Sequence, residues 1–323
     1  MEGTWWIPGE RDLGQRGVLE FTADRFNLTL EGGLIERPKP GPGATPVGWE
    51  EVNVPVIHGE MDDQIVSLLD CSGSVPTHDI GLVTAQNWWP RLMVLDGHAD
   101  QATRFDRLIM STEHLDEWAG TPTIERELDH DAGVATAVAV RAERQVLEEV
   151  DVQDVGRVSV VAFPTYEIRR LNASVALAAR VVVEPAAALS VDVCLETAEL
   201  VRSFLRLCIG TQTAITELHV REVGSSRSMR LVYRSIAFGG KPSSQQKRHD
   251  MFAARPDLPG GLGCALESWA GQFSRHDRMV PALRDRLREA HQRGRDVHRV
   301  LPGTRDASQR RLPSYRPRGR RAG

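Results

Sequence analysis

Short apolar segments separated by turn-forming residues dominate the first 240 residues, and this spacing constrains the possible folds more than any other feature of the chain. Strand-length segments bounded by Gly, Pro, Asn or Asp, here with a hairpin over residues 17–33, are typical of an antiparallel sandwich or barrel. Residues 173–183 are rich in Val and are expected to form a long central strand. The other segments expected to form strands are residues 52–57, 64–69, 80–85, 92–95, 108–111, 134–141, 158–163, 215–223 and 229–238.

Helical spacing begins near Leu195, where apolar residues recur at intervals of three and four until Gly210 supplies a stop. A helical turn over residues 115–118 and helices over 262–273 and 280–290 are also expected. The sequence therefore predicts an α+β fold, mainly antiparallel β-sheet (sandwich or barrel-like) with a few helices. The expected parts are a β-rich domain over 1–240, a linker over 241–261, a short helical C-terminal remnant over 262–292 and a basic disordered tail over 293–323.

The composition is that of a globular protein, with 41% apolar and 26% charged residues among 323. The N-terminus shows no signal-peptide pattern and no apolar stretch is long enough to span a membrane, so the cytoplasm is the expected location. The cysteines have no metal-knuckle spacing and are expected to be reduced and mostly buried. They are Cys71, Cys194, Cys208 and Cys264.

Charge divides the chain into two unequal parts. Residues 274–323 contain 15 Arg, no Lys and 5 acidic residues, for a net charge of +10. Residues 1–273 contain 25 basic and 39 acidic residues, for a net charge of −14. Since an acidic body repels a phosphate backbone, any contact with nucleic acid is expected only through the basic tail.

Several sequence blocks, in order, resemble the N-terminal domain of the ApeA family of bacterial anti-phage proteins. The resemblance runs from Met1 to about Trp269 and rests on their succession, because each block alone is short and built from common core residues. The blocks are Glu2-Gly-Thr-Trp-Trp-Ile-Pro-Gly9, Gly17-Val-Leu-Glu-Phe21, Leu28-Thr-Leu-Glu-Gly32, Pro55-Val-Ile-His-Gly59, Leu115-Asp-Glu-Trp-Ala-Gly120, Val201-Arg-Ser-Phe-Leu205 and Leu218-His-Val220.

The resemblance implies a β-rich module that senses infection, joined to a helical HEPN ribonuclease domain that cuts RNA. About 50 residues follow Trp269, too few for a four-helix HEPN core, so the nuclease domain is expected to be missing, through truncation or a frameshift. Two Arg-x4-His spacings, Arg286/His291 and Arg293/His298, fit the HEPN catalytic pattern of a proton-transferring His and a phosphate-binding Arg. In a segment so rich in Arg, chance accounts for such spacings.

The tryptophan doublets are the first candidates for a ligand site. Adjacent residues of a strand face opposite ways, so one Trp of each doublet can be core and the other can be exposed as a platform for a sugar or a base. Packing of all four in the core or at its rim is the simpler interpretation. The doublets are Trp5-Trp6 and Trp88-Trp89.

Polar clusters give weaker candidates. Asp96-Gly-His98-Ala-Asp100 and Asp129-His130-Asp131 contain metal-ligand types, but both are typical of polar turns, and no third cluster completes a site. His58, with acidic residues close behind it, suits an acid–base or ligand-binding role, or that of a hydrogen-bonded structural histidine. No catalytic residue, metal or cofactor is assigned.

Three functions remain open. The first is the sensor module of an abortive-infection defence system, not catalytic by itself, with a phage-derived or small-molecule ligand and a HEPN partner or a homo-oligomeric state. The second is a standalone β-sandwich that binds carbohydrate or nucleotide through exposed Trp. The third is a HEPN-type ribonuclease that uses the Arg/His pairs of the tail.

Overall fold

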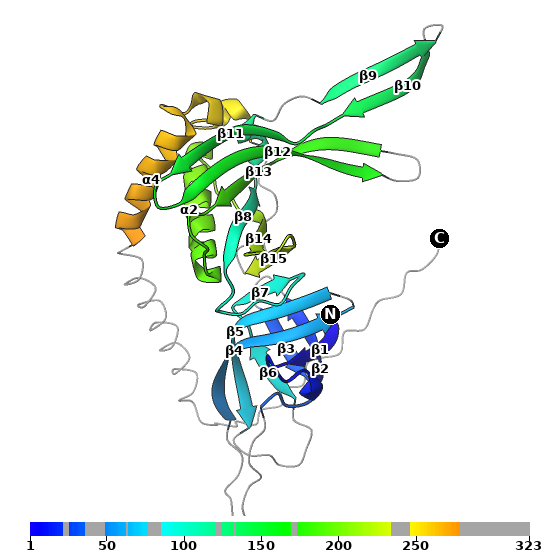
Figure 1. Cartoon of the computed structure of the whole chain (residues 1–323), viewed down its shortest axis with the longest axis vertical. Helices are drawn as coiled ribbons and strands as arrows, with labels where there is room; N and C mark the ends of the chain where they lie inside the picture. The colour runs from blue at the N-terminus through cyan, green and yellow to red at the C-terminus, as the bar shows by residue number, and fades with distance from the viewer. Residues whose placement is uncertain are drawn as a thin grey trace, which may run out of the picture. The chain divides into compact units, whose positions relative to one another are not determined.

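The structure is a computed structural model that describes residues 1–21, 26–35, 49–62, 64–76, 85–120, 124–131, 134–168, 173–233 and 246–277. The chain divides into two units, Met1–Gly271 and Gln272–Gly323. The first unit contains all the strands that the structure describes, and most of its elements are labelled in Figure 1. Every strand pairing given below is antiparallel.

Six N-terminal strands form a closed barrel. They follow one another around it in the order β5-β4-β1-β2-β3-β6, and β6 pairs with β5 to close the ring. Closure removes the open edges that a six-stranded sheet would otherwise expose. The strands are β1 (Glu2–Trp6), β2 (Gln15–Phe21), β3 (Phe26–Leu30), β4 (Trp49–Met61), β5 (Gln64–Pro76) and β6 (Gln86–Trp89), with the 3-10 helix η1 (Arg11–Leu13) between β1 and β2.

The barrel interior is filled by apolar side chains that alternate along its strands. Two tryptophans occupy it, and each lies across from a glycine: Trp5 pairs with Gly59 and Trp88 pairs with Gly73. A Cβ built on Gly59 would lie 2.3 Å from Cε3 of Trp5, so the ring packs directly on the β4 backbone. The other buried residues of this core include Leu19, Phe26, Leu28, Leu30, Ile57, Met61, Val66, Leu68 and Met93.

A second sheet continues from the barrel through β7. Its order is β11-β12-β13-β8-β14-β15-β7, and β7 also pairs with β5. A separate two-stranded sheet is formed by β9 (Glu125–Asp131) and β10 (Val134–Arg141). The strands of the second sheet are β7 (Leu92–Leu95), β8 (Phe105–Thr112), β11 (Gln145–Val152), β12 (Gly156–Ile168), β13 (Ala173–Glu184), β14 (Ile215–Glu222) and β15 (Ser228–Tyr233).

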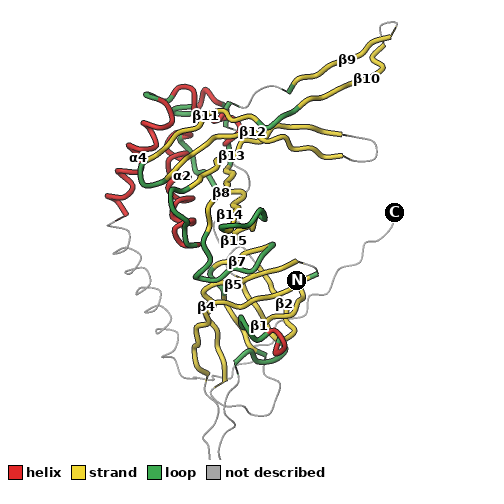
Figure 2. Tube along the Cα trace, viewed as in Figure 1, coloured by secondary structure: helices red, strands yellow, loops and turns green. Residues whose placement is uncertain are grey.

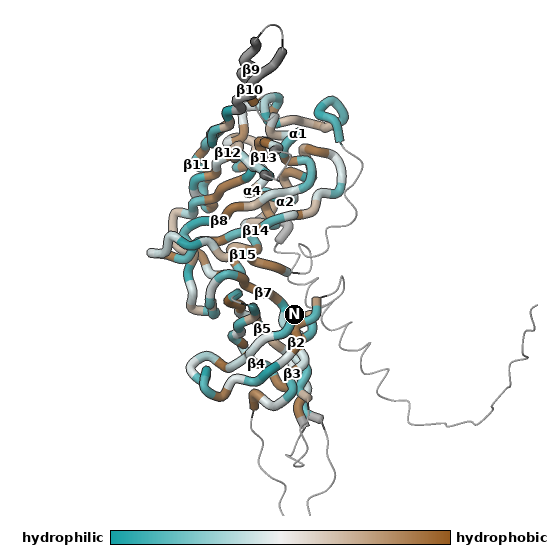
Figure 3. Tube along the Cα trace, turned by 90° about the vertical axis from the view of Figure 1, so that its right-hand side faces the viewer, coloured by the Kyte–Doolittle hydropathy of each residue, from teal (hydrophilic) through white to brown (hydrophobic). Residues whose placement is uncertain are grey.

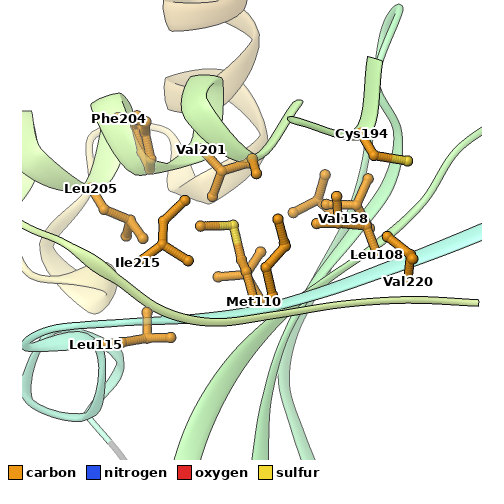
Figure 4. Close-up of a cluster of buried hydrophobic side chains, with 14 of the residues drawn as sticks. Leu108, Met110, Leu115, Val158, Cys194, Val201, Phe204, Leu205, Ile215 and Val220 are labelled. Carbon is orange, nitrogen blue, oxygen red and sulfur yellow. The ribbon is translucent and has the colours of Figure 1, made fainter. Parts of the chain in front are cut away.

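Helices cover one face of this second sheet and enclose the larger core (Figures 2 and 4). Helix α2 (Val191–Ile209) begins at Ser190, whose hydroxyl accepts from the N–H of Val193, and ends at Gly210 with φ of 81°. Val201, Phe204 and Leu205 of α2 point at the strand residues Leu108, Met110, Val158, Ile215 and Val220 (Figure 4). The remaining helices are α1 (Leu115–Ala119), α4 (Gly261–Asp277) and the short 3-10 turns η2 (Arg248–Asp250) and η3 (Arg255–Asp257).

The four residues of β7 belong to both cores. Leu92 and Val94 face the helix-covered core, whereas Met93 and Leu95 face the barrel interior. Strand alternation separates these two sets, and the uniformly apolar character of β7 can be followed in the hydropathy colouring of Figure 3. The barrel and the second sheet are therefore joined by a strand that is fully buried on both sides.

The predicted fold class is confirmed: the protein is mainly antiparallel β, with a barrel and a few helices. The segment 173–183 forms a strand, β13, as expected. Among the described pairs it has a neighbour on both sides only at its end, because it pairs with β8 only through residues 181–183. The segments 80–85 and 280–290 and the tail 293–323 lie outside the described residues, apart from residue 85. Three of the cysteines are buried, and Cys264 is exposed.

The region expected to be a linker, 241–261, is described from residue 246 onward and packs against the body there. Met251, Ala254 and Leu258 are buried in the helix-covered core. The guanidinium of Arg255 donates to the carbonyl oxygens of Ala119 and Leu147 and to the carboxylate of Glu148. A polar, Pro- and Gly-rich composition concealed these contacts, which depend on a few apolar side chains and one arginine.

Candidate functional site

The first tryptophan doublet is divided between the two faces of β1. Trp5 points into the barrel, while Trp6 lies on the outer face, where its cross-strand partner is His58 of β4. The next residue across the sheet is Ser67 of β5, which pairs with His58. One lateral row of the outer barrel surface therefore carries an indole, an imidazole and a hydroxyl.

A loop after β7 brings a second histidine onto this row. Asp96 turns the chain with φ of 69°, and its N–H donates to the carbonyl of Ile65 at 2.9 Å. The buried hydroxyl of Ser67 accepts from the N–H of Ala99 at 3.1 Å and lies 3.4 Å from Nδ1 of His98. Residues 96–103 are thereby fastened to β5, and we call them the His98 loop.

The two imidazoles stack on each other. The ring centroids of His58 and His98 are 4.2 Å apart, with 21° between the ring planes. Trp6 contacts both rings edge-on, at centroid distances of 6.4 Å and 5.6 Å. Arg11 lies over the indole ring, 5.2 Å from its centroid, and forms an ion pair with Glu60 at 2.6 Å.

Both histidines of this cluster favour the neutral form. Burial lowers the pKa of His58, and the adjacent His98 lowers it further, against a backbone hydrogen bond at Ala99 and the charge of Asp100. Burial and the charge of Arg11 lower the pKa of His98, against a backbone hydrogen bond at Val66 and the charge of Glu60. A second positive charge on stacked rings is unfavourable, since like charges so close repel.

One atom of the cluster is left without a hydrogen-bond partner. Nε2 of His58 is buried and finds no partner among the residues that the structure describes. Buried polar atoms are nearly always paired, so an orphan of this kind marks a position where a further group can bind. A neutral imidazole can accept a hydrogen bond there or take up a proton.

The four tryptophan side chains are more buried than those of an exposed binding platform would be. Trp5 and Trp88 are fully enclosed, Trp6 is only 5% exposed because His98 and Arg11 cover it, and Trp89 is half-buried. The packing interpretation describes these four positions better than an exposed aromatic platform does. The alternation of faces that the sequence predicts is present, but the outward-facing Trp6 is covered by a loop that comes from 90 residues away.

The candidate metal ligands are used in other ways. The carboxylate of Asp100 accepts from the N–H groups of Ala102 and Thr103 and from the hydroxyl of Thr103, at 2.8–2.9 Å, which makes it a turn residue. Asp129, His130 and Asp131 lie in strand β9, so the expectation of a turn there is wrong: these residues pair with β10. Within the described ranges, no three His, Cys, Asp or Glu side chains are arranged to hold a metal ion.

Four candidate residues, Arg286, His291, Arg293 and His298, lie outside the described part of the chain. His98 is the member of the cluster that the sequence presented as a turn residue or a weak metal-ligand candidate, and not as a partner of His58. Its place beside His58 depends on the pairing of β5 with β7, and a separation of 40 residues along the chain gives no local sign of that contact.

In the part of the chain that the structure describes, no helix has the length and apolar character needed to cross a lipid bilayer. Neither the curated proteins nor the solved structures contain a match to this chain. A family model does match it: the ApeA N-terminal domain 1, over residues 1–269, which covers the barrel, the second sheet and most of α4. The chain therefore belongs to the ApeA N-terminal domain 1 family, which suggests an association with anti-phage defence.

Proposed function

We propose that this protein is the sensing module of an anti-phage, abortive-infection system and is not catalytic by itself. The observation that carries the proposal is the family match over residues 1–269, which spans every strand and almost all of the packed body. The effector of such a system is a HEPN ribonuclease, which this module controls when a phage-derived or small-molecule ligand binds.

The His58–His98–Trp6 cluster supports a place for the ligand. His98 and Arg11 are exposed, and beneath them Nε2 of His58 lacks a partner among the described residues. A ligand with a hydrogen-bond donor gains a buried acceptor there, while the His98 loop closes over it. The loop leads directly into β8, so a shift of the loop is passed to the second sheet.

Transmission of this kind needs two conformations that the ligand distinguishes. The His98 loop is fastened to the barrel by hydrogen bonds with Gln64, Ile65, Ser67 and Asp70. Opening this loop breaks these contacts and exposes Trp6 and Ala99, so a ligand that binds one state of the loop more tightly shifts the balance between the two. The proposed trigger is therefore a change in how tightly the His98 loop is held.

The absence of catalysis is tested by RNA cleavage, with the purified full chain beside a version that ends at Phe273. Neither protein is expected to cleave RNA. Cleavage by the full chain alone would place a nuclease in the tail, and His291→Ala and His298→Ala would then identify its histidine.

Sensing is tested by hydrogen–deuterium exchange of the full chain with the low-molecular-mass fraction of extracts from infected and uninfected cells. The infected extract is expected to change the exchange of residues 96–103 more than the uninfected extract does. His58→Ala should remove this difference. An identical exchange pattern in both extracts refutes a small-molecule trigger at this site.

A further inference from the structure

The outer ends of β12 and β13 leave the second sheet as a two-stranded arm (Figures 1 and 2). The two strands pair with each other from Arg157/Glu184 to Ile168/Ala173. Among the described pairs, β13 meets β8 only at residues 181–183, and β12 meets β11 only up to Ala162. Among the described pairs, residues 174–178 of β13 and 163–168 of β12 therefore have no strand on their outer edge.

The direction of the backbone groups on the β13 edge follows from one hydrogen bond. The N–H of Ala179 donates to the carboxylate of Asp116, so it points away from β12. Because backbone groups alternate direction along a strand, the N–H and C=O groups of Val175 and Leu177 point the same way. The hydroxyl of Thr165 donates to the carbonyl of Ala176, which fits the opposite direction of that residue.

The two edges of the arm differ in how they are protected. On β12, the outward position opposite Leu177 is Pro164, which has no N–H to offer, and Glu167 adds a charge. On β13, residues 174–178 read Ser-Val-Ala-Leu-Ala, with no charge and no proline, and the edge is closed at Ala179 by the carboxylate of Asp116. Natural proteins block sheet edges with charged residues and prolines, so this part of the β13 edge lacks the usual obstacles to pairing with another strand.

One face of the arm is also apolar and open. The register places Pro164, Tyr166, Val175 and Leu177 on the face that continues the helix-covered core, and Tyr166 is 72% exposed there. A two-stranded ribbon is only marginally stable in water, whereas three or more strands with an apolar face are stable. The arm thus needs further strands beside β13.

We propose that residues 174–178 of β13 pair antiparallel with the same residues of a second copy of this chain, with Ala176 on the two-fold axis and Val175 of each copy opposite Leu177 of the other. A two-fold axis needs only a segment that is compatible with itself, and these five uncharged, small or branched residues meet that condition. The product is a four-stranded sheet, β12-β13-β13-β12, with Pro164 at both outer edges and one apolar face made by both copies. This interface lies on the arm and adds a homodimer contact that the proposed sensing role does not require.

The test compares two proline variants of the full chain by sedimentation velocity over a range of concentrations. Val175→Pro removes an outward N–H from the β13 edge, and Tyr166→Pro removes one from the β12 edge directly opposite. The wild type and Tyr166→Pro are expected to dimerise. Val175→Pro should have a dissociation constant at least about tenfold higher, because the two-fold axis doubles the loss of one hydrogen bond.

Circular dichroism establishes that both variants keep their strands. If Val175→Pro does not fold, Ala176→Lys gives a second test, since it keeps every backbone donor and adds a charge beside the edge. A wild type that is monomeric at every concentration overturns the proposal. So does an equal loss of the dimer in both proline variants, or none in either.

Discussion

Replacement of Gly59 by alanine is the most direct test of how the barrel interior is packed. The added Cβ would lie 2.3 Å from Cε3 and 2.4 Å from Cζ3 of Trp5, where carbon atoms normally approach to about 3.5–4.0 Å. The indole must therefore retreat by more than about 1 Å. Trp5 is completely buried and its Nε1 donates to the carbonyl of Gly17 at 3.3 Å, so the ring has little room in which to move.

The expected cost is that of overpacking a core, about 1–3 kcal/mol in the free energy of unfolding. For a body of this size, about 2–3 °C of melting temperature corresponds to each kcal/mol, so Gly59→Ala should melt roughly 2–9 °C below the wild type. The matched control is Gly271→Ala in α4, where no atom lies within 4 Å of the new Cβ. The same chemical change should there stabilise the helix by about 0.5–1 kcal/mol.

Urea unfolding followed by tryptophan fluorescence measures both variants. The midpoint for Gly59→Ala should fall while the slope stays constant, because the surface exposed on unfolding is unchanged. A Gly59→Ala protein as stable as Gly271→Ala would refute the close contact of Trp5 with the β4 backbone.

Three further predictions concern the site and the segment after residue 246. Ser67→Ala leaves the N–H of Ala99 without its acceptor and should cost about 1–3 kcal/mol in urea unfolding, whereas Ser72→Ala, at an exposed position of the same strand, should cost less than about 0.5 kcal/mol. The pKa values of His58 and His98 are lowered in the folded state, so the unfolded chain binds more protons just below its own histidine pKa of about 6.5. Stability should therefore fall as the pH drops through that value. His58→Gln should make the urea midpoint less dependent on pH. A midpoint that depends on pH as strongly as in the wild type would contradict the stacking. Arg255→Ala removes three hydrogen bonds and unpairs the carboxylate of Glu148, and it should lower the free energy of unfolding by about 2–4 kcal/mol, a loss that a flexible linker would not show.

The strand pattern of the sequence predicted the fold class because apolar alternation is a local property. Strand β11 escaped prediction, since its segment Gln145–Val152 contains three acidic residues. The carboxylate of Glu148 in this strand accepts from the guanidinium of Arg255 and from the N–H of Leu262. A charge satisfied by residues more than 100 positions away hides a strand from any local interpretation.

The candidate site was predictable only in part, for a similar reason. His58 could be selected because it follows a short apolar segment, and Trp6 because it belongs to a tryptophan doublet in an expected strand. Their adjacency requires the register of β1 with β4, and the contact with His98 requires the turn at Asp96. No spacing along the chain encodes either contact, so the cluster becomes visible only in the folded protein.

The short strand β7 has a consequence for how the protein unfolds. Its four side chains are divided equally between the barrel interior and the helix-covered core, and each of its neighbours belongs to a different half. If β7 detaches, both cores open to water together. The two halves should therefore melt as one cooperative unit, and binding energy gained at the barrel surface protects the second sheet as well.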